Sequence, residues 1–141
     1  MAMGRRAGRW SVPTVGVVVK PLKIFVAERS RLVAEALAAL FEEFAGDSEI
    51  TIALSTEEVI GIARREQPGL VVLNAWIDGD PATTVRKVRA LSPASAVYVF
   101  ATKYDSHLEN RLIGAGAAGF RETESLPGTV HTILSESGVA R

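Results

Sequence analysis

The amino-acid sequence predicts a single α/β domain in which helices cover both faces of a parallel β-sheet. Short apolar runs rich in β-forming residues alternate five times with longer segments of helical periodicity. Capping and turn residues separate these segments. The chain has 141 residues and no cysteine, so its core does not depend on a disulfide, and cysteine nucleophiles and cysteine-based metal sites are excluded.

The first strand–helix unit covers residues 23–44. Residues 23–27 form a short apolar run, as expected of a strand buried on both faces. A helix follows, with Ser30 suited to its N-cap and Gly46 to its end. Its expected apolar stripe repeats at intervals of three and four residues and consists of Leu32, Val33, Ala36, Leu37, Leu40, Phe41 and Phe44.

The pattern then repeats twice in the middle of the chain. Residues 50–54 form the second expected strand, and Thr56 is expected to cap a helix that ends before Pro68. Residues 70–73 form the third strand. Pro81 opens the third helix, because proline is tolerated in the first helical turn.

Two further units complete the alternation. Residues 97–100 and 119–120 are the fourth and fifth expected strands. Residues 106–115 and 126–137 are the fourth and fifth helices. This alternation predicts parallel strands joined by right-handed crossovers. In sheets of this kind, functional side chains lie beyond the carboxyl ends of the strands, and we expect them there.

The formal net charge is zero, from sixteen basic and sixteen acidic residues, which argues against direct nucleic-acid or membrane-surface binding. Residues 1–23 nevertheless hold five basic and no acidic residues, which leaves eleven basic and sixteen acidic residues in the other 118. We expect residues 1–21 to be a basic, disordered arm, residues 22–137 the folded domain and residues 138–141 a tail. No apolar run is long enough to span a membrane, and we expect a cytoplasmic protein.

Three segments at the functional edge of the expected sheet carry a family resemblance. Residues 26–37, 67–74 and 114–120 resemble the receiver domain of bacterial two-component response regulators, in the style of those with a helix-turn-helix output domain. The resemblance extends over residues 22–137. It implies a flavodoxin-like, doubly wound (βα)5 domain with strand order 2-1-3-4-5, acting in signal transduction or transcriptional regulation.

The residues that perform chemistry in the family are changed in this chain. A phosphoaccepting receiver has an aspartate after the third strand, two acids after the first, a serine or threonine after the fourth and a lysine after the fifth. The resemblance places here, in that order, Asn74, then Glu28 with Arg29, then Ala101, then Thr123. An amide does not form an acyl phosphate, and magnesium prefers carboxylate oxygens. We therefore expect a pseudo-receiver without enzymatic activity, metal or cofactor.

Three interpretations of the altered pocket are open. In the first, Arg29 replaces the metal by pairing with Glu28 and donating to the carbonyl oxygen of Asn74, so that the domain is locked or is switched by something other than phosphate. In the second, the pocket has decayed and only the scaffold matters. In the third, the least favoured, the phosphorylation chemistry is relocated to neighbouring residues: Asp78, Asp80, Thr102 and Lys103.

Aromatic residues near the expected pocket indicate where a small molecule would bind, and the surface of the last three elements indicates where a partner protein would bind. Phe120 occupies the position of the family's switch aromatic and is expected to point inward, next to the space left by Ala101. Trp76 is expected to be a lid on the domain or, together with Tyr104, the edge of a small-molecule site. A homodimer is expected through a surface formed by the fourth helix, fifth strand and fifth helix: His107, Arg111, Leu112, Arg121, Glu122, Val130 and Leu134. A DNA-binding output domain or a partner regulator is the other expected partner.

Overall fold

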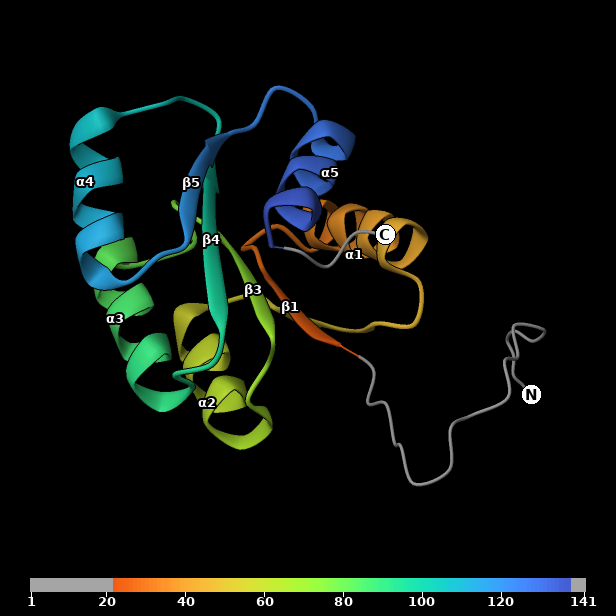
Figure 1. Ribbon diagram of the computed structural model, residues 1–141, viewed down its shortest axis with the longest axis horizontal. Helices are drawn as coiled ribbons and strands as arrows, with labels where there is room; N and C mark the ends of the chain where they lie inside the picture. Colours follow the sequence, from red (N-terminus) through yellow and green to blue (C-terminus); the bar gives the residue numbers. More distant parts are fainter. Residues whose placement is uncertain (1–21, 138–141) are drawn as a thin grey trace.

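A five-stranded parallel sheet lies between two layers of helices in the computed structural model, which describes residues 22–137 (Figure 1). The strands are ordered β2-β1-β3-β4-β5, so the predicted fold class and strand order are confirmed. The expected arm and tail, residues 1–21 and 138–141, lie outside the described residues.

Strands and helices alternate strictly along the described chain. In order they are β1 (Lys23–Ala27), α1 (Arg31–Ala45), β2 (Glu49–Ala53), α2 (Thr56–Glu66), β3 (Leu70–Asn74), α3 (Pro81–Leu91), β4 (Ala96–Ala101), α4 (Ser106–Ala115), β5 (Gly119–Glu122) and α5 (Leu126–Ser137).

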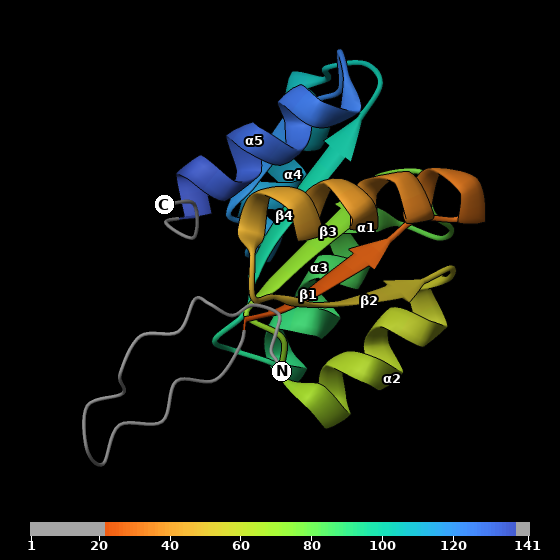
Figure 2. The same ribbon diagram turned by 90° about the vertical axis from the view of Figure 1, so that its right-hand side faces the viewer.

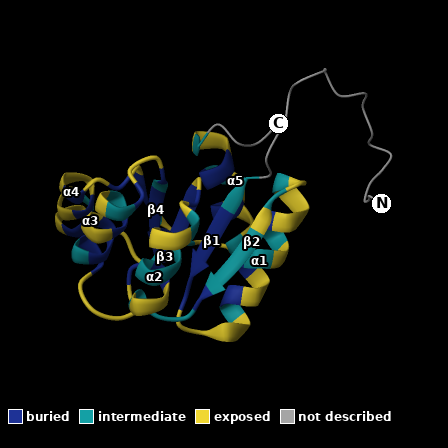
Figure 3. Cartoon of the chain, turned by 90° about the horizontal axis from the view of Figure 1, so that it is seen from below, coloured by how far each residue is buried: buried dark blue, intermediate teal, exposed yellow. Residues whose placement is uncertain are grey.

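The helices divide into two groups because the connection from β1 to β2 runs one way across the sheet and the later connections run the other way. Right-handed crossovers that run in opposite directions lie on opposite faces of the sheet. Helices α1 and α5 pack together on one face, and α2, α3 and α4 cover the other (Figures 1 and 2). Each group encloses its own apolar cluster, one around Phe41 of α1 and one around Phe120 of β5. Figure 3 shows the central strands as the most deeply buried part of the domain. This rigid sheet fixes the positions of the loops that follow β1, β3, β4 and β5.

The structure corrects two local predictions. The N-cap of α2 is Ser55, whose side chain accepts a hydrogen bond from the backbone N–H of Glu58, and Thr56 is the first helical residue. The stripe on α1 is also narrower than expected. Leu32 is 79% exposed and Ala36 is exposed, whereas Ala34, which the prediction omitted, is buried. The buried residues of α1 are Ala34, Leu37 and Phe41, which are spaced by three and four residues.

Within residues 22–137, none of the helices combines the length and the apolar character required to traverse a lipid bilayer.

Candidate functional site

The carboxyl ends of β1 and β3 bring Glu28 and Asn74 together at one edge of the sheet. Glu28 is 4% exposed, and its Oε1 accepts a hydrogen bond from Nδ2 of Asn74. Its Oε2 accepts from the backbone N–H of Ser30 at 2.6 Å. The Oδ1 of Asn74 in turn accepts from the backbone N–H of Trp76 at 2.8 Å. The buried carboxylate thus has a hydrogen-bond donor on each oxygen, as buried polar groups require.

Arg29 does not pair with Glu28, contrary to what the first of the three interpretations expected. Its side chain is exposed, and no ion pair joins it to Glu28 among the described residues. The backbone bends at Arg29, just beyond the end of β1, and Glu28 is buried whereas Arg29 is exposed. The asparagine itself supplies the donor that the arginine was expected to supply. The pocket is therefore closed by a direct amide–carboxylate bond.

The pocket does not fit a magnesium ion of the kind that the receiver fold uses. Magnesium is held by carboxylate and other oxygens at near-ideal octahedral geometry. Here the one acidic ligand that the pocket retains, Glu28, already accepts two hydrogen bonds, and the side chain facing it presents an N–H group. Within residues 22–137, no group of three histidine, cysteine, aspartate or glutamate side chains is arranged to hold a metal ion.

The ends of β4 and β5 carry no groups that restore the missing chemistry. Ala101 is 2% exposed and its carbonyl accepts from the backbone N–H of Thr123 at 2.7 Å. Thr123 stands where the family has a lysine and brings no positive charge. Its Oγ1 is buried and has no hydrogen-bond partner among the described residues. The neighbouring Thr102 and Lys103 are both exposed.

The two acids of the relocated-chemistry interpretation have other partners. One carboxylate oxygen of Asp78 accepts from the backbone N–H and the hydroxyl of Thr56, at 2.8 and 2.7 Å. Asp80 caps α3 and accepts from Arg111 of α4 at 2.5 Å. The Arg111 guanidinium and the hydroxyl of Thr83 hold the pKa of Asp80 below its usual value. Asp78 therefore connects the loop after β3 to the first residue of α2, and Asp80 connects the start of α3 to α4.

The three aromatic residues of this edge do not form one cluster. Trp76 is 63% exposed, so it is not the packed lid that we expected. Phe120 is 2% exposed, and its ring centroid lies 6.0 Å from that of Tyr104. The hydroxyl of Tyr104 donates to Glu109 of α4 at 2.5 Å, and this bond together with nearby negative charge raises the pKa of Tyr104. Tyr104 thus connects the loop after β4 to both β5 and α4.

The surface formed by α4, β5 and α5 differs from the predicted one in its apolar residues. Leu112, Val130 and Leu134 are at most 1% exposed and belong to the core. The exposed apolar residue of α4 is instead Ile113, at 47%. Arg121 of β5 is held by Glu136 of α5, to which its Nε donates at 3.1 Å.

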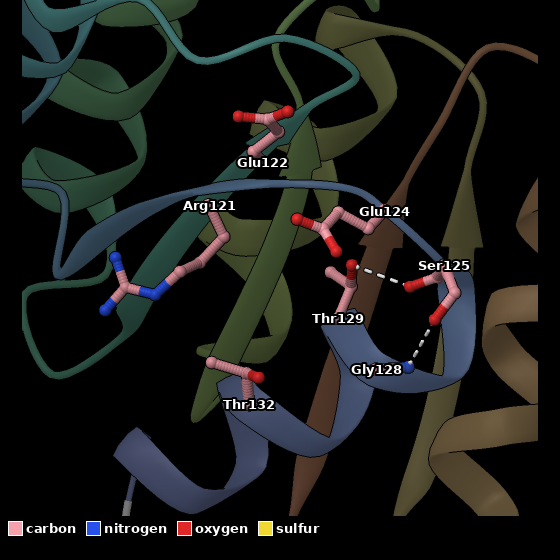
Figure 4. A pocket seen from close by; sticks show the side chains of 7 residues that line it. All are labelled: Arg121, Glu122, Glu124, Ser125, Gly128, Thr129 and Thr132. Atoms are coloured by element: carbon pink, nitrogen blue, oxygen red, sulfur yellow. Dashed lines mark hydrogen bonds between the residues drawn. The ribbon is translucent and has the colours of Figure 1, made fainter.

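A pocket of about 210 Å³ lies on this surface between β5 and α5. Figure 4 shows its lining, which is polar and comes from β5, the loop after it and the first turns of α5: Arg121, Glu122, Glu124, Ser125, Gly128, Thr129 and Thr132. It is separate from the Glu28–Asn74 pair, and sequence reasoning did not anticipate it because no motif marks it.

Solved structures of response regulators share this fold. A LuxR-family two-component response regulator from Aurantimonas sp. SI85-9A1 superposes with a TM-score of 0.75 at 20% identity, over 86% of this chain and 89% of that one. The receiver domain of the putative response regulator NarL from Mycobacterium tuberculosis gives 0.75 at 17% identity, over 85% and 98%. A response regulator from Burkholderia pseudomallei, solved with a phosphorylated aspartate, gives 0.73 at 16% identity over 82% of this chain, which spans 65% of that longer protein.

No protein-family model and no curated protein sequence matches the chain. At the identities above, the structural similarity establishes the receiver fold. It does not carry the phosphorylated aspartate of the Burkholderia protein over to this chain, which has Asn74 at the end of β3.

Proposed function

We propose that this chain is a phosphorylation-independent receiver-like module of signal transduction or transcriptional regulation, which acts through contacts with other proteins. Its fold is that of receiver domains, which supports a signalling role. The hydrogen bond from Asn74 to Glu28 is the single observation that carries the independence from phosphate.

That hydrogen bond involves both the residue at the nucleophile position, Asn74, and the retained acid, Glu28. The amide nitrogen of Asn74 is delocalised and its oxygen is neutral, so the side chain lacks the nucleophilic carboxylate of an acyl-phosphate former. The same N–H group occupies one oxygen of Glu28, the one acid that the pocket retains. The amide of Asn74 thereby removes the nucleophile and occupies Glu28, and Arg29 replaces the second acid that would hold a metal ion.

The contacts of α4 support a single fixed conformation. Arg111 ties the middle of α4 to Asp80 at the start of α3, and Glu109 accepts from Tyr104 in the loop after β4. Charge-assisted hydrogen bonds of this kind are short and directional. We infer that they hold α4 and the loop before it in place without a phosphoryl group.

The surface of α4, β5 and α5 is the proposed partner face, and a second copy of the chain is the proposed partner. Ile113 supplies an exposed apolar side chain, and the Arg121–Glu136 pair and the polar pocket lie on the same surface. Exposed apolar residues rimmed by polar groups are typical of protein–protein contacts.

Titration with magnesium and beryllofluoride, a phosphate analogue, tests the independence from phosphate. We expect no saturable shift of the amide resonances of Asn74, Ala101 and Phe120, and no change in Trp76 fluorescence. The Burkholderia pseudomallei response regulator, which was solved with a phosphorylated aspartate, is the positive control. Saturable shifts at those amides in the wild-type protein would contradict the proposal.

Light scattering over a range of concentrations tests the partner face. We expect a mass that rises toward two copies, and a shift back to one copy in Ile113→Asp. Leu32→Asp, which alters an exposed leucine on α1, is the matched control and should dimerise normally. Equal weakening by both variants, or a monomer at every concentration, would contradict this face.

A further inference from the structure

The sheet has an open edge at β2. The backbone N–H of Glu49 donates to the carbonyl of Leu22, and the carbonyl of Ala53 accepts from Glu28, so these residues of β2 face β1. Alternate residues of a strand direct their backbone groups to opposite sides, and those of Ile50 and Ile52 therefore point away from β1. No strand of the described chain lies beyond β2 to receive them.

The side chains along this edge are also incompletely covered. Ile50 and Ile52 are only half-buried, although they pack against the cluster around Phe41. The strand on the other side of β1, in contrast, has leucine and valine residues that are at most 1% exposed. An unpaired strand edge with half-exposed isoleucines is a template for another extended segment.

Negative charge collects at the beginning of this edge. Glu42 and Glu43 lie in the last turn of α1, where the helix dipole already places partial negative charge and no basic residue offsets it. Glu49 opens β2 and is exposed. None of these three glutamates forms an ion pair among the described residues.

The chain itself supplies a segment that matches this edge. Residues 14–19 read Thr-Val-Gly-Val-Val-Val, are rich in β-branched residues, and are bounded by Pro13 and Pro21. Lys20 follows them, and residues 1–21 contain basic but no acidic residues. The segment therefore combines an apolar, strand-forming centre with the charge that complements the glutamates.

The connection has the required length. The described chain begins at Leu22, whose carbonyl is bonded to the first residue of β2. A position beyond β2 is two strand spacings from β1, or about 10 Å. The three Cα–Cα steps from Lys20 to Lys23, the first residue of β1, span about 10 Å when extended, which returns the preceding residues antiparallel to β2.

We propose that residues 14–19 dock on the open edge of β2 as a sixth, antiparallel strand of the same chain, with Lys20 beside Glu49. The docked segment would accept and donate hydrogen bonds at Ile50 and Ile52 and cover their side chains. Lys20 would then lie beside the acidic end of α1, and residues 1–13 would precede the docked strand at the opposite end of β2.

Amide hydrogen exchange in the full-length chain tests this docking. We expect the amides of Ile50 and Ile52 to exchange at least about tenfold more slowly than exposed amides. Proline removes a backbone donor, and neighbouring residues of a strand face opposite sides. Only one of Val17→Pro and Val18→Pro should therefore release this protection, and the other is its matched control, while Val71 and Val72 of β3 stay protected in both.

Three results would overturn the proposal. The first is fast exchange of Ile50 and Ile52 in the unaltered chain. The second is an equal effect, or no effect, of the two proline variants. The third is the expected alternation accompanied by a light-scattering mass that falls from two copies to one in the sensitive variant, which would assign the added strand to a second copy.

Discussion

The side-chain amide of Asn74 donates to the carboxylate of Glu28, across the gap between two neighbouring strands. Each residue satisfies the other, and backbone N–H groups of Ser30 and Trp76 complete the pair. The order of donor and acceptor matters because Glu28 is buried and a like charge opposite it would be unfavourable. This relationship leads to the first prediction.

Asn74→Asp should destabilise the domain at neutral pH. The change replaces a hydrogen-bond donor by a second carboxylate, and we expect the free energy of unfolding in urea to fall by about 1–3 kcal/mol. Adding Glu28→Gln to this variant should recover most of the loss, because the new amide donates to the carboxylate introduced at position 74 while its oxygen still accepts from Ser30. Unaltered stability of the single variant, or no recovery in the double one, would contradict the assigned bond.

Thr123→Val should stabilise the domain. The Oγ1 of Thr123 is buried without a partner among the described residues, and valine keeps the shape of the side chain while removing the unsatisfied hydroxyl. We expect the free energy of unfolding to rise by about 1 kcal/mol. Thr129→Val is the control, since that hydroxyl donates to the carbonyl of Ser125 at 2.9 Å, and its loss should lower stability by about the same amount.

The Asp80–Arg111 pair should make stability depend on acid pH. The pKa of Asp80 in the folded state lies below its ordinary value of 3.8, so the folded state favours the ionised form. The stabilisation is present above that ordinary value and is lost as the pH falls through the lowered pKa. Asp80→Asn keeps an N-cap residue and removes the charge. Its urea midpoint should fall less on acidification than that of the wild type.

Glu124→Gln is the control for this pH dependence, because Glu124 is exposed and forms no ion pair among the described residues. It should show the acid response of the wild type. A parallel response of Asp80→Asn and the wild type would show that the pair contributes nothing.

Two glycines of the α4 region should respond oppositely to alanine. Gly116 ends α4 with φ +111°, and an added Cβ would lie 3.2 Å from Cγ of Arg89. Gly116→Ala should cost about 1 kcal/mol or more, because φ is positive and Arg89 must move. Gly114→Ala, inside α4 with open space around the new Cβ, should raise stability by about 0.5–1 kcal/mol. Thermal unfolding of both variants measures the contrast, and changes of the same sign would contradict it.

The alternation of apolar runs and helical stripes was sufficient to predict the architecture, because each element's pattern is local. The bounds of β1, α4 and α5 agree with the predicted ranges. Local pattern was insufficient for the cap of α2, where Ser55 and Thr56 are both good capping residues and only the backbone conformation distinguishes them.

The sequence predicted which residues lie at the site, but not which of them contact one another. The sequence identified Glu28 and Asn74 as neighbours, since parallel strands end at the same edge of a sheet. It did not reveal that Arg29 turns outward, which depends on the backbone bend after β1. Nor did it reveal that Asp80 pairs with Arg111, because 31 residues separate them and their meeting depends on how α3 packs against α4.

On the proposed function, the Asn74–Glu28 contact also bears on how long a signal lasts. A phosphoaspartate hydrolyses, so a domain that forms one returns to its resting state at the rate of that hydrolysis. A hydrogen bond within the chain has no such decay, and on the proposed function the domain is in its working state from the moment it folds. The cell would then adjust the output through the number of copies present, that is, through synthesis and degradation of the protein.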